Sequence, residues 1–198
     1  MNKINRNFYR FSSNYLDTLY SSFNEDIFIK VEKLASHLKK VWTEGKNIYI
    51  CGNGGSGANA IHLANDLHYG AGACGKKPIV KGLKVEALTA NSAVITCLGN
   101  DIGYDMIFSH QLLNKASEGD LLIALSGSGN SQNILNALET AKEIGMYSYA
   151  ILGYSGGKSL TLANCPIHFQ INDMQIAEDT QLIVGHLCMQ WLTENKPF

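Results

Sequence analysis

Little in this sequence favours secretion, membrane insertion or nucleic-acid binding. Its five cysteines are scattered singly, with no C-x-x-C pair, which argues against a disulfide framework and a cysteine zinc site. No apolar run approaches the roughly 20 residues that span a bilayer, and the N-terminus lacks the apolar core of a signal peptide. The formal net charge of −1 gives no electrostatic reason to bind nucleic acid or an anionic membrane. We therefore expect a cytoplasmic protein without nucleic-acid or membrane partners.

Proline is also scarce, at 3 residues, but a hydrophobic share of 45% leaves an ordinary globular composition. A chain of 198 residues is long enough for one well-buried α/β domain and short for two. No internal repeat, low-complexity tract or linker suggests a second domain. We expect residues 1–198 to form a single domain, with a helical segment at 1–45 followed by an α/β core at 46–198.

Strand-like and helix-like patterns alternate through this core. Helical patterns separate the β-prone runs and close the chain at about 177–193. The β-prone runs themselves lie at residues 48–51, 85–88, 120–125, 147–152 and 167–171. Strands that alternate with helices through short loops predict an α/β fold with a three-layer, doubly wound parallel sheet, whose ligands bind at the carboxyl ends of the strands. The glycine-rich stretch at 70–77 is predicted to be a mobile loop.

The N-terminal segment is predicted to form two helices. Aromatic and leucine side chains recur at three- and four-residue spacing from Phe8 to Phe23, and a polar break at 24–26 precedes a second periodic stretch that ends near Gly45. Because an aromatic-rich helix of this kind needs partners that a small domain does not supply, we expect the segment to serve in oligomerisation. The alternative is packing within the monomer.

Two short loops rich in glycine and serine follow two of the predicted strands. The first, Gly-Asn-Gly-Gly-Ser at 52–56, lies between a strand and a helix, which places backbone N–H groups around an anion. Its spacing matches neither a dinucleotide fingerprint nor a Walker loop. Ser56 can add a hydroxyl donor or cap the helix. Cys51, just before the loop, is expected to be a small apolar filler rather than a nucleophile.

The second loop, Ser-Gly-Ser-Gly-Asn-Ser at 126–131, has the same strand–loop–helix setting. Either loop alone is explained equally well as an ordinary turn. Together they predict that both loops converge on one phosphate group.

Histidines and carboxylates recur at helical spacing on two predicted helices. His62 and Asp66 are four residues apart, and Glu178 and His186 are eight apart, so each pair shares a helix face. Such a set suits proton transfer or metal binding. The alternative for each histidine is a core residue with its hydrogen bonds satisfied.

The residues of the two loops, 51–56 and 126–131, together resemble those of the sugar isomerase (SIS) domain, and within it the phosphoheptose isomerase family. The likeness runs from roughly residue 5 to residue 193. It implies an SIS-type, flavodoxin-like topology, a homotetramer and no nucleotide cofactor. It also implies an enzyme that converts sedoheptulose 7-phosphate to D-glycero-D-manno-heptose 7-phosphate through an enediol or enediolate, for heptose biosynthesis.

The same resemblance implies roles for individual residues. Asp66 and His186 form the acid/base pair, and one zinc ion per subunit is held by His62, Asp66, Glu178 and His186. The implied substrate contacts come from both loops and from two further positions: Asn53, Gly54, Gly55, Ser56, Asp101, Ser126, Gly127, Ser128, Ser131 and Glu178.

The chain departs from the family pattern at four of these or neighbouring positions. Asp66 replaces a glutamate, Glu178 a glutamine, Gly127 a threonine and Gly70 an arginine. The first two changes favour a bound metal, because all four side chains of the set are competent ligands. Two alternatives stay open: a non-catalytic SIS-domain regulator that binds a phosphosugar or a replication initiator, and an isomerase of another ketose phosphate.

Overall fold

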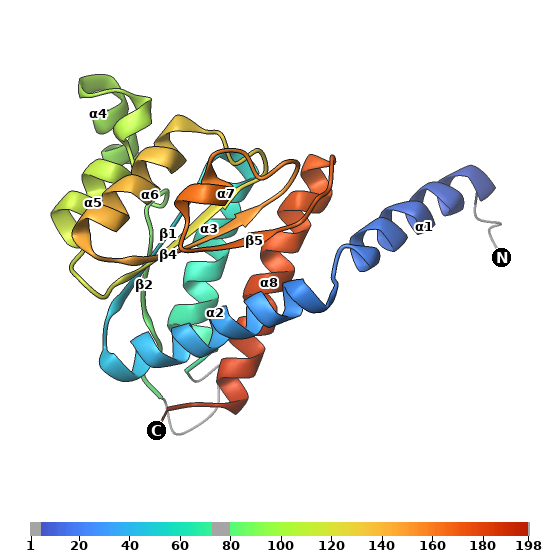
Figure 1. The fold of residues 1–198 in the computed structure, drawn as a ribbon, viewed down its shortest axis with the longest axis horizontal. Helices are drawn as coiled ribbons and strands as arrows, with labels where there is room; N and C mark the ends of the chain where they lie inside the picture. Colours follow the sequence, from blue (N-terminus) through green and yellow to red (C-terminus); the bar gives the residue numbers. More distant parts are fainter. Residues whose placement is uncertain (1–4, 73–79, 198) are drawn as a thin grey trace.

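A computed structural model describes residues 5–72 and 80–197 and contains one five-stranded sheet (Figure 1). All pairings in the sheet are parallel, and the strand order is β2–β1–β3–β4–β5. The strands are β1 (Asn47–Gly52), β2 (Lys84–Ala87), β3 (Leu121–Ser126), β4 (Tyr147–Leu152) and β5 (Cys165–His168). This is the flavodoxin-like order of a doubly wound sheet, and it confirms the predicted fold class.

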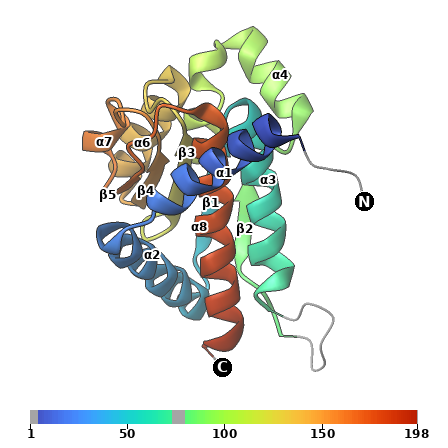
Figure 2. The ribbon, with the colours of Figure 1, turned by 90° about the vertical axis from the view of Figure 1, so that its right-hand side faces the viewer.

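Helices cover both faces of the sheet, which makes three layers. One face is covered by three helices, α2 (Glu25–Glu44), α3 (Gly54–Asn65) and α8 (Met174–Glu194), which lie together in Figure 2. The other face carries α4 (Ser92–Asp101), α5 (Ser109–Lys115), α6 (Gln132–Ile144) and α7 (Ser159–Leu162). A π-helical turn, Asp66–Gly70, extends α3, and a 3₁₀ turn, Tyr104–Met106, precedes α5. Among the described residues, every helix is too short or too polar to cross a lipid bilayer.

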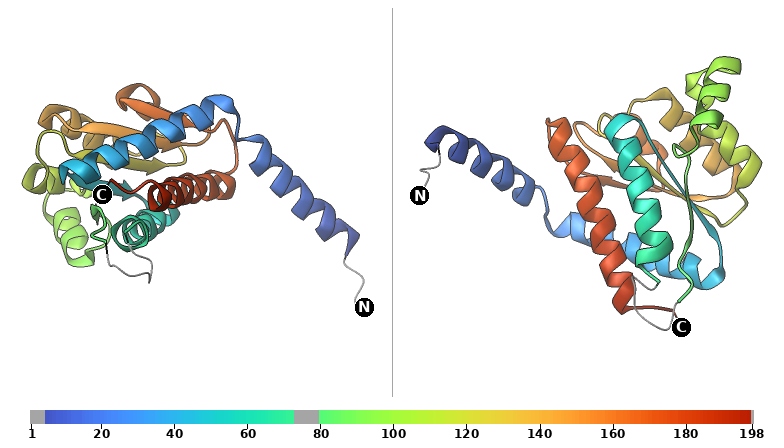
Figure 3. Two further views of the ribbon diagram at one scale, coloured as in Figure 1. Left: turned by 90° about the horizontal axis from the view of Figure 1, so that it is seen from below. Right: turned by 180° about the vertical axis from the view of Figure 1, so that it is seen from behind.

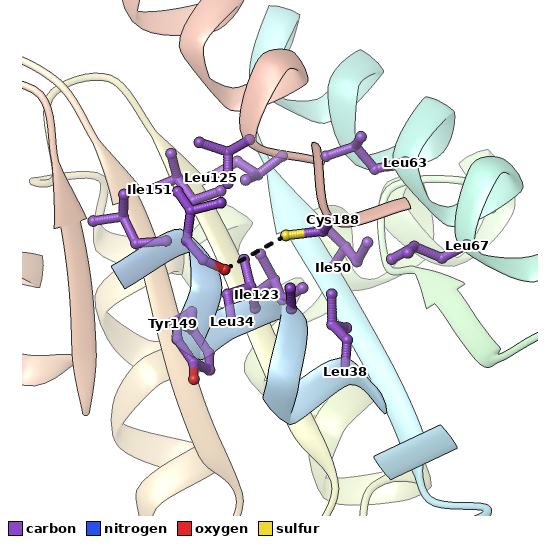
Figure 4. Close-up of a cluster of buried hydrophobic side chains, with 14 of the residues drawn as sticks. Leu34, Leu38, Ile50, Leu63, Leu67, Ile123, Leu125, Tyr149, Ile151 and Cys188 are labelled. Atoms are coloured by element: carbon purple, nitrogen blue, oxygen red, sulfur yellow. Dashed lines mark hydrogen bonds between the residues drawn. The ribbon is translucent and has the colours of Figure 1, made fainter. Parts of the chain in front are cut away.

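The alternation of side chains along the strands builds two cores. In β1, Ile48 and Ile50 face the layer of α2, α3 and α8, whereas Tyr49 and Cys51 face the opposite layer. Figure 4 shows the first core, where strand side chains meet leucines of α2 and α3 and Cys188 of α8. The three central strands, β1, β3 and β4, are buried on both faces and are therefore nearly continuous apolar runs.

The two N-terminal helices behave differently. The side chain of Asn24 caps α2 by accepting from the Ile27 amide at 3.0 Å, and seven residues of α2 are buried. By contrast, α1 (Arg6–Ser21) has no buried residue and projects from the body of the molecule (Figures 1 and 3). The Tyr15 hydroxyl of α1 donates to Asp179 Oδ2 of α8 at 2.6 Å. The predicted segment 1–45 thus contains one helix of the core and one that packs on the core through Tyr15 and Leu19 while its N-terminal part projects.

Two predicted boundaries were wrong, and a third prediction is not tested. The last strand is Cys165–His168 rather than 167–171; it tolerates Pro166 because it lies at the sheet edge. The last helix begins at Met174 rather than 177, because the Asp173 carboxylate caps it by accepting from the Ile176 amide at 3.1 Å. Most of the predicted loop at 70–77 lies outside the described residues.

The strand order determines where ligands can bind. β1 and β3 are neighbours, and the chain leaves them toward opposite sides of the sheet. A doubly wound sheet forms its ligand crevice at this switch point, beyond the carboxyl ends of the strands. Both glycine- and serine-rich loops follow these two strands.

Candidate active site

A cavity of about 250 Å³ lies at the carboxyl ends of β1 and β3. It is lined by every proposed substrate contact except Asp101, and by Leu125 and Met174: Asn53, Gly54, Gly55, Ser56, Leu125, Ser126, Gly127, Ser128, Ser131, Met174 and Glu178. The structure therefore brings the two loops together around one space. We call the part of the cavity formed by residues 53–56 and 126–131 the phosphate cradle.

The first loop presents the N-terminus of α3 to the cavity. Asn53 precedes the helix, and Gly54 adopts a φ of 53° that side-chain-bearing residues rarely adopt. Ser56 is part of the first helical turn, so it does not cap the helix. Its buried oxygen accepts a hydrogen bond from Gln181 Nε2 at 3.0 Å, which leaves the hydroxyl hydrogen available for a ligand.

The second loop folds back on itself and rests on the chain after β4. Ser126 Oγ accepts from the Gly129 amide at 3.0 Å, and the loop carbonyls of Gly127 and Gly129 accept from the amides of Gly153 and Ser159 at 2.9 and 3.0 Å. Position 129 requires glycine, because its φ is 65° and because a Cβ atom there would collide with the backbone of Gly156. These hydrogen bonds fix the conformation of the loop. Helix α6 begins directly after it, at Gln132.

A pair of asparagines joins the two loops. Asn53 and Asn133 each donate from the amide nitrogen to the other's amide oxygen at 2.9 Å, and the Tyr104 hydroxyl donates to Asn53 Oδ1 at 3.0 Å. The Asn53 side chain, predicted to contact sugar hydroxyls, is therefore used to tie the loops. Sequence reasoning missed Asn133, Tyr104 and Gln181, because none belongs to a local motif and each bonds to a segment far away in the sequence.

Farther along α3 and α8, three of the four predicted acid/base or metal residues meet. His62 Nε2 lies 2.8 Å from His186 Nε2, and Asp66 Oδ2 lies 3.3 Å from the first nitrogen and 3.5 Å from the second. The α3 and α8 helices run side by side here (Figure 2). Asp66 begins the π-helical turn, a distortion often found at functional sites. We call these three residues the His–Asp cluster.

The donor set of this cluster suits zinc. The nearest atoms, Nε2 of His62, Nε2 of His186 and Oδ2 of Asp66, lie 2.8 to 3.5 Å from one another. A tetrahedral zinc ion with ligands about 2.0–2.1 Å away holds its ligand atoms about 3.3 Å apart. Two imidazoles and one carboxylate that leave a fourth position open are typical of catalytic zinc.

Glu178 and Asp101 lie apart from this cluster. Glu178 is two helical turns before His186, about 12 Å along α8, and its carboxylate packs against Gly55 in the cavity wall. Asp101 is at the exposed end of α4, where it accepts from Asn100 Nδ2 at 2.7 Å and does not line the cavity.

Cys51 is the apolar filler that its position predicted. Its side chain is fully buried in the second core, and burial raises the pKa of the thiol to about 12. A thiol with so high a pKa stays protonated and is not a nucleophile at neutral pH.

Comparisons with known proteins agree with the architecture. A family model described as "SIS domain" matches residues 10–153. A phosphoheptose isomerase of Aneurinibacillus thermoaerophilus is 34% identical over 164 residues, which make up 83% of this chain and 80% of that protein. A phosphoheptose isomerase of Aliarcobacter butzleri is 36% identical over 161 residues, or 81% and 82% of the two chains. The solved structure of a phosphoheptose isomerase from Francisella tularensis has the same fold, with a TM-score of 0.85 at 23% identity over 95% of this chain and 97% of that one.

Proposed function

The chain belongs to the SIS domain family and, within it, to the phosphoheptose isomerases, and we propose that it converts sedoheptulose 7-phosphate to D-glycero-D-manno-heptose 7-phosphate. The reaction moves a proton between C1 and C2 of the open-chain sugar and passes through an enediol or enediolate. It needs a phosphate site, an acid/base group and stabilisation of the developing oxygen charge. The proposed product serves heptose biosynthesis.

The observation that carries this proposal is the distance between the phosphate cradle and the His–Asp cluster. Ser56 and His62 lie on the same helix six residues apart, which is about 9 Å at 1.5 Å per residue. An extended sugar chain advances about 1.3 Å per carbon–carbon bond, so C2 of a heptulose 7-phosphate is about 9 Å from its phosphorus. A triose phosphate is less than half as long and would not reach both groups.

Within the cluster, Asp66 and His186 are the proposed acid/base pair. Asp66 takes the proton from one carbon and returns it to the other, while His186 exchanges protons with the sugar oxygens. His62 orients His186 through the 2.8 Å contact between their Nε2 atoms. A zinc ion held by His62, Asp66 and His186 would supply a Lewis acid for the C1 and C2 oxygens, in place of the proton exchange by His186.

Glu178 and Asp101 are the remaining proposed substrate contacts. Glu178 lines the cavity and lies on α8 two turns before His186, and its carboxylate can accept from a sugar hydroxyl. Asp101 would act on the cavity of a neighbouring copy, because it lies outside the cavity of its own chain.

A homotetramer is the proposed assembly, and α1 supports it. Large apolar side chains of α1 are mostly exposed, among them Phe8 (63%), Phe11 (66%) and Leu16 (60%). A helix that projects with such a face uncovered is stabilised by burying it against other copies. The cytoplasm stays the predicted compartment, on the ground of the scattered cysteines.

The test is an NMR assay of zinc-loaded protein with sedoheptulose 7-phosphate in D₂O. We expect the aldose 7-phosphate to form with deuterium at C2, and we expect His62→Ala to lose both bound zinc and turnover. Ligand-induced stabilisation without product in any metal state would instead indicate the binding regulator or another ketose phosphate as the substrate. Elemental analysis that finds no metal in an active protein would remove zinc from the proposal.

A further inference from the structure

Met174, the first residue of α8, received no role from the sequence. It lines the cavity and packs over Gly127 of the second loop. A Cβ atom at position 127 would stand 2.6 Å from Met174 Sδ and 3.1 Å from Met174 Cε. Because real Cβ contacts essentially never fall below 3.0 Å, the thioether occupies the space that a side chain at 127 would take.

The charge of the phosphate cradle makes the apolar side chain of Met174 important. Among the described residues that line the cavity there is no lysine or arginine, and the charged side chain is the Glu178 carboxylate. A phosphate must therefore be held by neutral donors: the amides at the starts of α3 and α6 and the serine hydroxyls. Such hydrogen bonds are stronger where water is excluded. Met174, which is 37% exposed, and buried Leu125 place apolar atoms beside these donors.

We propose that Met174 is a specificity-determining residue that forms the side wall of the phosphate cradle and sets how tightly the terminal phosphate monoester is bound. This inference rests on the proposed function, because it names the wall of the same site. The wall acts at the phosphate end: His186 is twelve residues farther along α8, about 18 Å away. Changes in Met174 therefore alter substrate affinity and leave the proton-transfer step nearly untouched.

The steric pair of Met174 and Gly127 gives the proposal a second consequence. Gly127 has a φ outside the left-handed region, so its backbone accepts alanine. The atom that an added methyl group would meet is near the end of a flexible side chain, which can turn away. The thioether is then displaced from its place over the loop and disturbs the cradle. Alanine at 127 thus weakens phosphate binding without unfolding the protein, and only while Met174 is present.

The experiment measures KM and kcat for sedoheptulose 7-phosphate, and competitive inhibition by inorganic phosphate, in five variants: Met174→Ala, Met174→Leu, Gly127→Ala, the double variant Gly127→Ala/Met174→Ala, and Gln175→Ala. Gln175 is the exposed neighbour that does not line the cavity, so it is the matched control. We expect Met174→Ala to raise KM and the phosphate inhibition constant about fivefold, with kcat within about twofold. Met174→Leu keeps the apolar wall and stays near wild type.

Gly127→Ala is expected to raise both constants about tenfold, whereas the double variant is expected to match Met174→Ala within about twofold. Equal effects of Gly127→Ala with and without Met174, or an unchanged inhibition constant in Met174→Ala, would overturn the proposal. If wild type lacks turnover but phosphate protection against thermal unfolding still follows this pattern, the wall is supported and the isomerase proposal fails. If wild type is active and none of the five substitutions changes phosphate binding, the proposal for Met174 is wrong and the isomerase proposal stands.

Discussion

Replacing Asp66 by asparagine is the sharpest test of the His–Asp cluster. The substitution keeps the size of the side chain and its oxygen near the two imidazoles, at 3.3 and 3.5 Å, but removes the negative charge and the basicity. Positioned general bases contribute about 10²- to 10⁴-fold to a rate, which is about 3 to 5 kcal/mol in the activation free energy. We expect kcat to fall within that range or further, because the zinc ligand is weakened as well.

The effect on KM should be small, because Asp66 lies ten residues beyond Ser56 of the phosphate cradle, about 15 Å along the helix axis. The assay is deuterium incorporation at C2 together with product formation, measured on metal-loaded protein. Asp26→Asn is the matched control: Asp26 is also a helical carboxylate with a partner four residues away, Lys30 at 2.7 Å, but it is exposed and far from the site. A kcat within tenfold of wild type in Asp66→Asn would remove Asp66 from the proton transfer and refute the assignment.

Three further outcomes follow from packing and charge. Glu178→Gln removes the carboxylate from the cavity and should lower the inhibition constant of inorganic phosphate about tenfold; a rise would show that Glu178 aids anion binding. Leu38→Ala opens a cavity beneath α2, where Leu38 is 1% exposed, and should cost about 2–5 kcal/mol of unfolding free energy in denaturant titration. Iodoacetamide at pH 8 should modify exposed Cys97 well before Cys51, whose buried thiol has its pKa raised to about 12; equal rates by mass spectrometry would contradict that burial.

The sequence predicted those elements whose signal is local. Residues 147–152 form β4 over the full predicted range, because a strand buried on both faces is a continuous apolar run. Both loops were recognisable from their glycines and serines. The edge strand was misplaced because Pro166 weakens the strand pattern where only one neighbour must be hydrogen-bonded. The start of α8 could have been predicted from the sequence, since aspartate is a typical helix-capping residue and Asp173 caps this helix.

What could not be predicted depends on contacts between distant segments. The Asn53–Asn133 pair spans 80 residues and arises because β1 and β3 become neighbours in the sheet. The π-helical turn at Asp66 has no composition signal, although it sets where the carboxylate meets His186. Helical spacing put Glu178 and His186 on one face of α8, but spacing alone does not say that two turns of helix separate the phosphate cradle from the His–Asp cluster.

The distribution of charge around the site explains how two of the four departures from the family pattern, Asp66 and Glu178, fit together. The proposed substrate is a dianion, and the cradle meets it with neutral donors and the positive ends of α3 and α6. Glu178 sets a negative charge beside that cradle; two unit charges about 7 Å apart interact by about 2 kcal/mol at an effective dielectric constant of about 20. This repulsion weakens phosphate binding unless positive charge is present farther along the sugar. A divalent ion on His62, Asp66 and His186 would leave that end net positive, with Asp66 counted. An acidic side chain at 178 is therefore best tolerated in a protein that carries a metal at the His–Asp cluster.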